Sequence, residues 1–149
     1  MTAQVSIEVE VLSDHAAIVT LRGEHDLHSR PEVAEALAGI SACGNVVVDL
    51  SACSFLDSAI ISALLQTATR LHERGGLLRI VMTGDSHAGV RRLFELMSLE
   101  RIMPIHSSRA VAVAGLATRP QEPPATARRV RALGEIIDQS NPLDDSRAA

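Results

Sequence analysis

The residues best suited to chemistry are Asp57 and Ser58, which lie between a short apolar run and a longer one in the segment SFLDSAIISALL. A serine hydroxyl beside a carboxylate can act as a nucleophile or a phosphoacceptor, or it can belong to a helix start with no further role. Asp57 as N-cap and Ser58 in the first turn need no function, so capping is the simpler interpretation of the segment by itself. Chemistry and capping both remain open at this point.

Nucleophilic and phosphoaspartate chemistry are disfavoured by what the chain lacks. A hydrolase that carries its serine on a strand-to-helix elbow needs flanking glycines, which LDSAI does not have, and a larger sheet that supplies an acid and a histidine. A phosphoaspartate receiver could use Asp49 or Asp57, but receivers also depend on a lysine late in the chain. All 14 basic residues are arginines, so this requirement fails.

A metal site is the third possibility, because EHDLH places Glu24, His25, Asp26 and His28 in one segment. Carboxylates and imidazoles are suitable ligands for several divalent metals. The other histidines are scattered along the chain, and no second cluster completes a coordination shell. We therefore interpret these side chains as solvated loop residues and expect neither a metal nor another cofactor.

Regulatory phosphorylation of Ser58 is the fourth possibility. Its hydroxyl would project from the first turn of a helix over 58–74, where free backbone N–H groups and the positive end of the helix dipole stabilise a phosphate. The phosphate would add about −1.5 to −2 charges beside Asp57 and Asp26. Such a change would alter what this surface can bind.

Apolar periodicity predicts the elements that position these residues. Strands are indicated at 5–11, 17–21, 46–50 and 77–82, with at most an edge strand at 102–105 because Pro104 cannot donate a hydrogen bond. Helices are indicated from 31 to 40, over 58–74, around 90–97 and from 107 to 116. The alternation of strands and helices along the chain implies parallel strands with right-handed crossovers, whereas the first two strands can form an antiparallel hairpin. We expect an α/β fold with a mixed sheet of four to five strands and about four helices packed on it.

The composition changes near residue 118, which divides the chain into a domain over 1–117 and a tail over 118–149. The tail opens with the proline-rich RPQEPPAT, and its last residues, NPLDDSRAA, have no apolar period. Between them, ARRVRALGEIIDQ has a one-sided apolar pattern, but its arginines oppose the helix dipole and it contains a glycine. We expect the tail to be a linker followed by a disordered or marginally helical segment.

The overall composition excludes several kinds of partner. The formal net charge is −4, so no basic surface favours nucleic acid or an anionic membrane. With two Phe, no Trp and no Tyr, the chain is also poorly equipped for base stacking. Cys43 and Cys53 flank a predicted strand, too far apart for a disulfide, and unpaired thiols suit a reducing compartment. With no apolar signal core and no segment of transmembrane length, we expect a cytoplasmic protein.

Three separated motifs together resemble the STAS domain family, which includes bacterial anti-sigma factor antagonists (anti-anti-sigma factors) and the cytoplasmic tails of sulfate transporters. LRGEHDLHSRPEV is similar to the family's Gly-Glu-x-Asp turn and first helix. VVVDLSACSFLDSA is similar to its strand, loop and Asp-Ser segment, and VRRLFELMSL to its Val-x-Arg-Leu-Phe segment. The resemblance extends over roughly 5–116 and implies a STAS-like sheet and helices for this part of the chain.

The resemblance to the antagonist branch implies a partner switch. The unmodified protein would bind an anti-sigma factor that is also a serine kinase and so release the sigma factor. Phosphorylation of Ser58 by that kinase would end binding, and a PP2C-type phosphatase would restore it. Family members have no activity of their own, so no catalytic residue is implied. The implied partner-binding residues are Asp26, Asp49, Ser51, Asp57, Ser58, Ala59 and Ile60.

The chain departs from the family pattern at four positions. Ala59 replaces a hydroxyl residue, Ile60 and Ser62 replace glycines, and Ser98 replaces the glycine that ends the third helix. Ile60 would add bulk either to the core or toward a partner, so we expect an altered contact surface. The alternative function is a phosphorylation-independent STAS adaptor in a transport or signalling assembly, in which Ser58 is only a helix-start residue.

Overall fold

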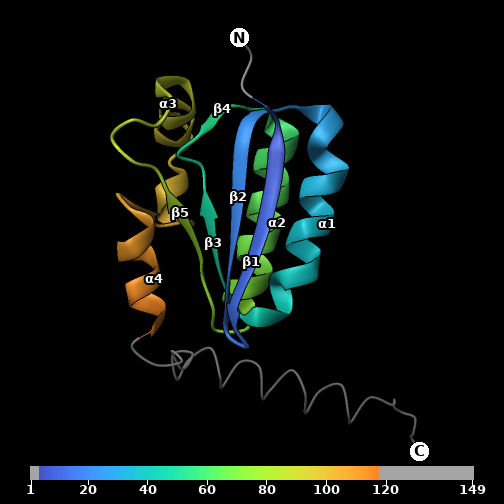
Figure 1. Cartoon of the computed structure of the whole chain (residues 1–149), viewed down its shortest axis with the longest axis vertical. Coiled ribbons are helices and arrows are strands. Elements are labelled where there is room, and N and C mark those ends of the chain that lie inside the picture. Colours follow the sequence, from blue (N-terminus) through green and yellow to red (C-terminus); the bar gives the residue numbers. More distant parts are fainter. Residues whose placement is uncertain (1–3, 118–149) are drawn as a thin grey trace, which may run out of the picture.

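In the computed structural model, residues 4–117 are described, and they form a β-sheet with helices on both faces (Figure 1). The predicted tail over 118–149 lies outside the described residues. The strands are β1 (Ser6–Ser13), β2 (Ala16–His25), β3 (Asn45–Asp49), β4 (Cys53–Leu56), β5 (Leu78–Val81) and β6 (Ile105–His106). The helices are α1 (Arg30–Ile40), α2 (Ser58–Glu73), α3 (Ala88–Leu96) and α4 (Arg109–Ala117). The predicted α/β class and the four helices are confirmed for this part of the chain.

The sheet is mixed, as the sequence predicts. Its strand order is β1-β2-β3-β5-β6, and β4 pairs with β2. The first two strands form the predicted antiparallel hairpin, and every other pairing is parallel. Parallel strands place their carboxyl ends at one edge of the sheet, so the segments that follow β2 and β4 meet there.

Strand β4 was not predicted, and it raises the number of strands among the described residues to six instead of four to five. It forms because β2 is longer than β3. The first half of β2, over 16–20, pairs with β3, and its last three residues pair with β4 instead. A strand of four residues has too few alternations to be recognised from its own sequence.

Apolar side chains, nearly all of them aliphatic, cover the two faces of the sheet. The larger cluster lies between the sheet and the side chains of α1, α2 and α3, and its fully buried members include Leu37, Leu64 and Phe94. A smaller cluster, in which Val47 and Val81 meet Ala112, packs α4 on the opposite face. No helix within residues 4–117 is long and apolar enough to cross a membrane.

The chain between α3 and β6 differs from its predicted form. The edge strand expected at 102–105 is instead β6 at Ile105–His106, preceded by a 3₁₀ turn at Leu99–Arg101. Met103 is fully buried, and the N–H of Ile80 in β5 donates to the carbonyl of Pro104 at 2.8 Å, so the segment before β6 is anchored by a side chain and by a backbone hydrogen bond. Ser98, where the resemblance implies a glycine, has the left-handed conformation with φ 52° and ψ 39°.

Candidate functional site

The site begins where β2 and β4 end side by side. In their parallel register His25 lies opposite Leu56, so the next residues, Asp26 and Asp57, are neighbours at the edge of the sheet. The backbone N–H of Asp57 donates to the carbonyl of His25 at 3.0 Å and fixes this arrangement. Strand pairing therefore brings together the backbones of two acidic residues that are far apart in the sequence.

Asp57 is the N-cap of α2, as predicted. Its backbone is extended, with φ −76° and ψ 155°, and its Oδ1 accepts the N–H of Ala59 at 2.8 Å. Its carbonyl accepts the first intrahelical hydrogen bonds, from Ile60 at 3.0 Å and Ile61 at 3.1 Å. Helix α2 therefore starts regularly although the family's glycines are missing.

Ser58 is the first residue of α2, and it is exposed. Its Oγ lies 3.5 Å from Oδ1 of Asp57, the limit of a hydrogen bond, so the hydroxyl is only weakly held. A phosphate on this oxygen would lie at the amino end of a 16-residue helix, where the dipole favours negative charge. The geometry is compatible with modification of the hydroxyl.

Asp26 forms a cap of its own, at the 3₁₀ turn of Leu27–Ser29 that leads into α1. Its Oδ1 accepts the N–H of His28 at 2.9 Å and lies 3.5 Å from the Nδ1 of the same residue. The backbone hydrogen bond from His28, assisted by the charge of its ring, lowers the pKa of Asp26 below its ordinary value. Asp26, Asp57 and Ser58 together form a surface that we call the Ser58 surface.

Asp49 does not belong to that surface. It is 8% exposed, and its Oδ2 accepts two hydrogen bonds from Arg109 at the start of α4, the shorter of 2.8 Å. The same guanidinium donates to Oγ1 of Thr20 at 2.7 Å. Burial raises the pKa of Asp49, but the hydrogen bonds from Ser51 and Arg109 and the charge of Arg109 outweigh it and lower the pKa below its ordinary value.

Three other residues of the predicted partner-binding set are less exposed than Ser58, and one of them is fully buried. Ser51 is half-buried in the turn between β3 and β4, where its N–H donates to Oδ1 of Asp49 at 2.9 Å. Ala59 is half-buried. Ile60 is 0% exposed and belongs to the large core cluster, so its bulk is directed to the core and not toward a partner.

The metal interpretation receives no support from the positions of the EHDLH side chains. Glu24 and His28 are exposed, whereas His25 is fully buried, contrary to the prediction that all four are solvated. Among the described residues, no group of three or more His, Cys, Asp or Glu side chains lies close enough to hold a metal ion.

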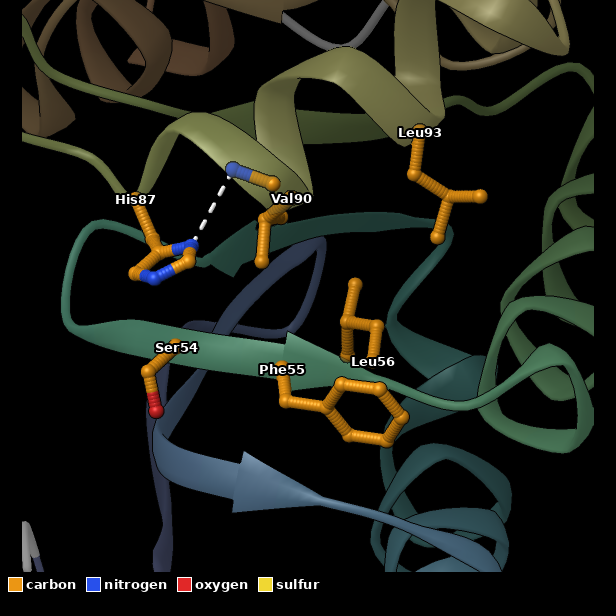
Figure 2. A pocket seen from close by; sticks show the side chains of 7 residues that line it. Ser54, Phe55, Leu56, His87, Val90 and Leu93 are labelled. Atoms are coloured by element: carbon orange, nitrogen blue, oxygen red, sulfur yellow. Dashed lines mark hydrogen bonds between the residues drawn. The ribbon is translucent and has the colours of Figure 1, made fainter.

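An apolar groove beside the Ser58 surface was missed in the sequence (Figure 2). It has a volume of about 300 Å³ between β4 and α3, and Leu56 points across it toward Val90 and Leu93. Phe55, on the other side of the strand, is 46% exposed. The available signal for this groove was the aromatic residue Phe55 in the four-residue strand β4. It can be interpreted only once β4 is known to lie at the surface.

The chain belongs to the STAS domain family, because the model of that family matches residues 6–112. A Mycobacterium tuberculosis protein provisionally named an anti-anti-sigma factor is 37% identical over 78 residues, which are 52% of this chain and 50% of that protein. An anti-sigma F factor antagonist of Paenibacillus polymyxa is 29% identical over 103 residues, 66% of this chain and 85% of that protein. The chain thus spans half of the first relative and most of the second.

A solved structure agrees with these similarities. The crystal structure of an anti-sigma factor antagonist from Mycobacterium paratuberculosis matches with a TM-score of 0.64 and 26% identity, over 76% of this chain and 94% of that one. The STAS-like fold expected from the sequence motifs is therefore confirmed.

Proposed function

We propose that this protein is an anti-sigma factor antagonist whose binding to an anti-sigma factor is switched off by phosphorylation of Ser58. The observation that carries the proposal is the exposed Ser58 hydroxyl at the start of α2, beside the carboxylate of Asp57 and next to the strand end that carries Asp26. The names of the two curated relatives and of the solved structure support the same function.

The switch follows from the charges on the Ser58 surface. Before modification, Asp26 and Asp57 present two carboxylates that a cationic patch of the partner can approach. A phosphate adds about −1.5 to −2 charges at the same place and needs its own hydration shell. The positive end of the helix dipole stabilises the phosphate within this protein. The partner surface is complementary to an unmodified serine, so it no longer fits the phosphorylated one. The modification therefore acts on the complex and leaves the fold intact.

The apolar part of the contact is assigned to the neighbouring groove. A protein complex needs about 800 Å² from each partner, more than a serine and two carboxylates supply. The groove is lined in part by Leu56, the residue before Asp57. We assign its occupant as an apolar side chain of the anti-sigma factor, a kind of anchor that often dominates binding energy.

In this function the enzymes are the partners. The anti-sigma factor is the serine kinase that modifies Ser58, a PP2C-type phosphatase removes the phosphate, and this chain supplies no catalytic residue. The encounter takes place in the cytoplasm, where the thiols of Cys43 and Cys53 stay reduced.

The test uses purified full-length chain, ATP and the anti-sigma kinases of the same organism. Mass spectrometry is expected to find phosphate on Ser58 in the wild type and none on that peptide in Ser58→Ala. Ser58→Glu is expected to weaken binding to the same kinase at least tenfold. Thr69→Glu, at an exposed residue near the other end of α2, is the control and keeps its affinity.

The adaptor function predicts a different outcome. There the chain binds its partner whether or not position 58 is charged, and no kinase that binds it modifies Ser58. Unchanged affinity of Ser58→Glu together with an unmodified serine would reject the phosphorylation switch in favour of the adaptor.

A further inference from the structure

His25 occupies the variable position of the Gly-Glu-x-Asp turn, and its imidazole is 0% exposed. Nε2 lies 3.0 Å from the carbonyl oxygen of Arg22 and 3.2 Å from that of Ser6. Nδ1 lies 3.1 Å from Oγ of Ser29. Both ring nitrogens therefore have hydrogen-bond partners within the protein.

These partners determine which nitrogen carries the proton. A carbonyl oxygen can only accept, so Nε2 must be protonated to satisfy its two contacts. The Ser29 hydroxyl donates to the carbonyl of Asp26 at 3.2 Å, and its oxygen lies 3.1 Å from Nδ1. A leucine of similar size would fill the space but make none of these bonds, and it would leave the hydroxyl of Ser29 with the carbonyl of Asp26 as its one remaining partner, at 3.2 Å.

The bonds join three segments around the Ser58 surface. Ser6 belongs to β1, Arg22 to β2 and Ser29 to the turn that leads into α1. The backbone carbonyl of His25 accepts the N–H of Asp57, and the next residue is Asp26. The buried ring of His25 thus orients the backbone that carries Asp26, and the backbone carbonyl of His25 anchors Asp57.

We propose that His25 is a positioning residue for the Ser58 surface. Through its Nε2–H the ring holds the β2–α1 turn against β1, and this sets the relative position of Asp26 and Asp57 that the anti-sigma factor recognises. The effect on partner binding rests on the proposed function, whereas the clamp itself does not.

The clamp is tested first without a partner. In nitrogen NMR of the full chain, Nε2 of His25 is expected to carry a proton. In His25→Leu, the amide of Asp57 is expected to exchange with solvent about tenfold faster than in the wild type, since its acceptor is less firmly held. His72→Leu, at an exposed histidine in the last turn of α2, should leave that exchange rate unchanged. An Nε2 without a proton, or unchanged exchange at Asp57 in His25→Leu, would overturn the proposal.

Binding then tests the positioning role. His25→Leu and Ser29→Ala are each expected to weaken binding to the anti-sigma kinase about fivefold to tenfold, and the double variant is expected to be no weaker than His25→Leu alone, because both remove one clamp. Thr67→Val, which removes a buried hydroxyl bonded within α2, controls for general loss of stability. His25→Gln, which retains a donor near Nε2, should recover part of the affinity.

The two proposals fail in different ways. If Asp26→Ala weakens binding but His25→Leu binds like the wild type, His25 is only a core residue and the positioning role is wrong. If no kinase binds the wild type, the proposed function fails, while the imidazole signature and the exchange rate at Asp57 still decide whether the clamp exists.

Discussion

The backbone N–H of Asp57 donates to the carbonyl of His25 at 3.0 Å, and this contact joins the end of β2 to the residue that caps α2. It exists because the last residues of β2 pair with β4 and not with β3. The consequence is that Asp26 and Asp57 lie at the ends of neighbouring strands, with Ser58 beside them.

The two roles of Asp57, capping and charge, can be separated by two substitutions. Asp57→Ala removes the acceptor of the Ala59 N–H and is expected to lower the free energy of unfolding by about 1 kcal/mol. Asp57→Asn retains a cap of similar strength but removes the charge, so it should be nearly as stable as the wild type while its affinity for the anti-sigma factor changes. Urea unfolding and a binding titration of both variants measure this. Equal loss of stability in the two would contradict the capping role.

The Asp49–Arg109 ion pair predicts a pH-dependent contribution to stability. The pKa of Asp49 is lowered in the folded protein, so the contribution is present above the unfolded-state pKa of about 3.9 and is lost as the pH falls through the folded value. Because the Arg109 side chain is 40% exposed, the coupling is expected to be about 1 kcal/mol at pH 7. A double-mutant cycle with Asp49→Asn and Arg109→Gln, repeated between pH 7 and pH 3, measures it. A coupling that grows on acidification would refute this assignment.

Ile60 is expected to affect stability and not partner contact. Ile60→Ala should cost about 2–5 kcal/mol and Ile60→Val about 0.5–1.5 kcal/mol, since the side chain is fully buried. The folded Ile60→Val variant should bind the anti-sigma factor like the wild type. Thermal unfolding and binding assays test the two statements, and a large loss of affinity in stable Ile60→Val would show that the side chain reaches the interface.

Ser98 has a conformation that favours glycine. At φ 52° a residue with a Cβ is strained by roughly 1–2 kcal/mol. A glycine relieves this strain, but part of the gain is lost because glycine has greater conformational entropy in the unfolded chain. Ser98→Gly is therefore expected to raise the free energy of unfolding by about 0.5–1 kcal/mol. Ser98→Ala retains the strain and should bring no gain, which makes it the control in the same chemical denaturation series.

The two cysteines should react at different rates with a thiol reagent. Burial raises the pKa of Cys53 to about 11, so its reactive thiolate is scarce at neutral pH, and the side chain is 1% exposed. We expect modification of Cys53 only after unfolding in denaturant, whereas the half-buried Cys43 reacts in the native state. Cys53→Ala should leave the fast phase of modification, which we assign to Cys43, unchanged. A fast phase that disappears in this variant would show that Cys53 is accessible.

The sequence by itself determined the class of the fold, the antiparallel first pair, the boundaries of α2 and the cap at Asp57. These features depend on local periodicity and on short-range chemistry between neighbours in the chain, and both are visible in the order of the residues. The motif that points to Ser58 is likewise local.

Tertiary structure decided how the polar residues are divided between the surface and the interior. Asp49 and Asp57 look alike in the sequence, yet Arg109, sixty positions away from Asp49, covers one of them, while the other caps a helix at the surface. His25 resembles the solvated residues around it, but strands β1 and β2 and the start of α1 enclose its ring. Burial depends on which distant segments pack against a residue, and the pairing of β4 with the end of β2 is a long-range choice of that kind.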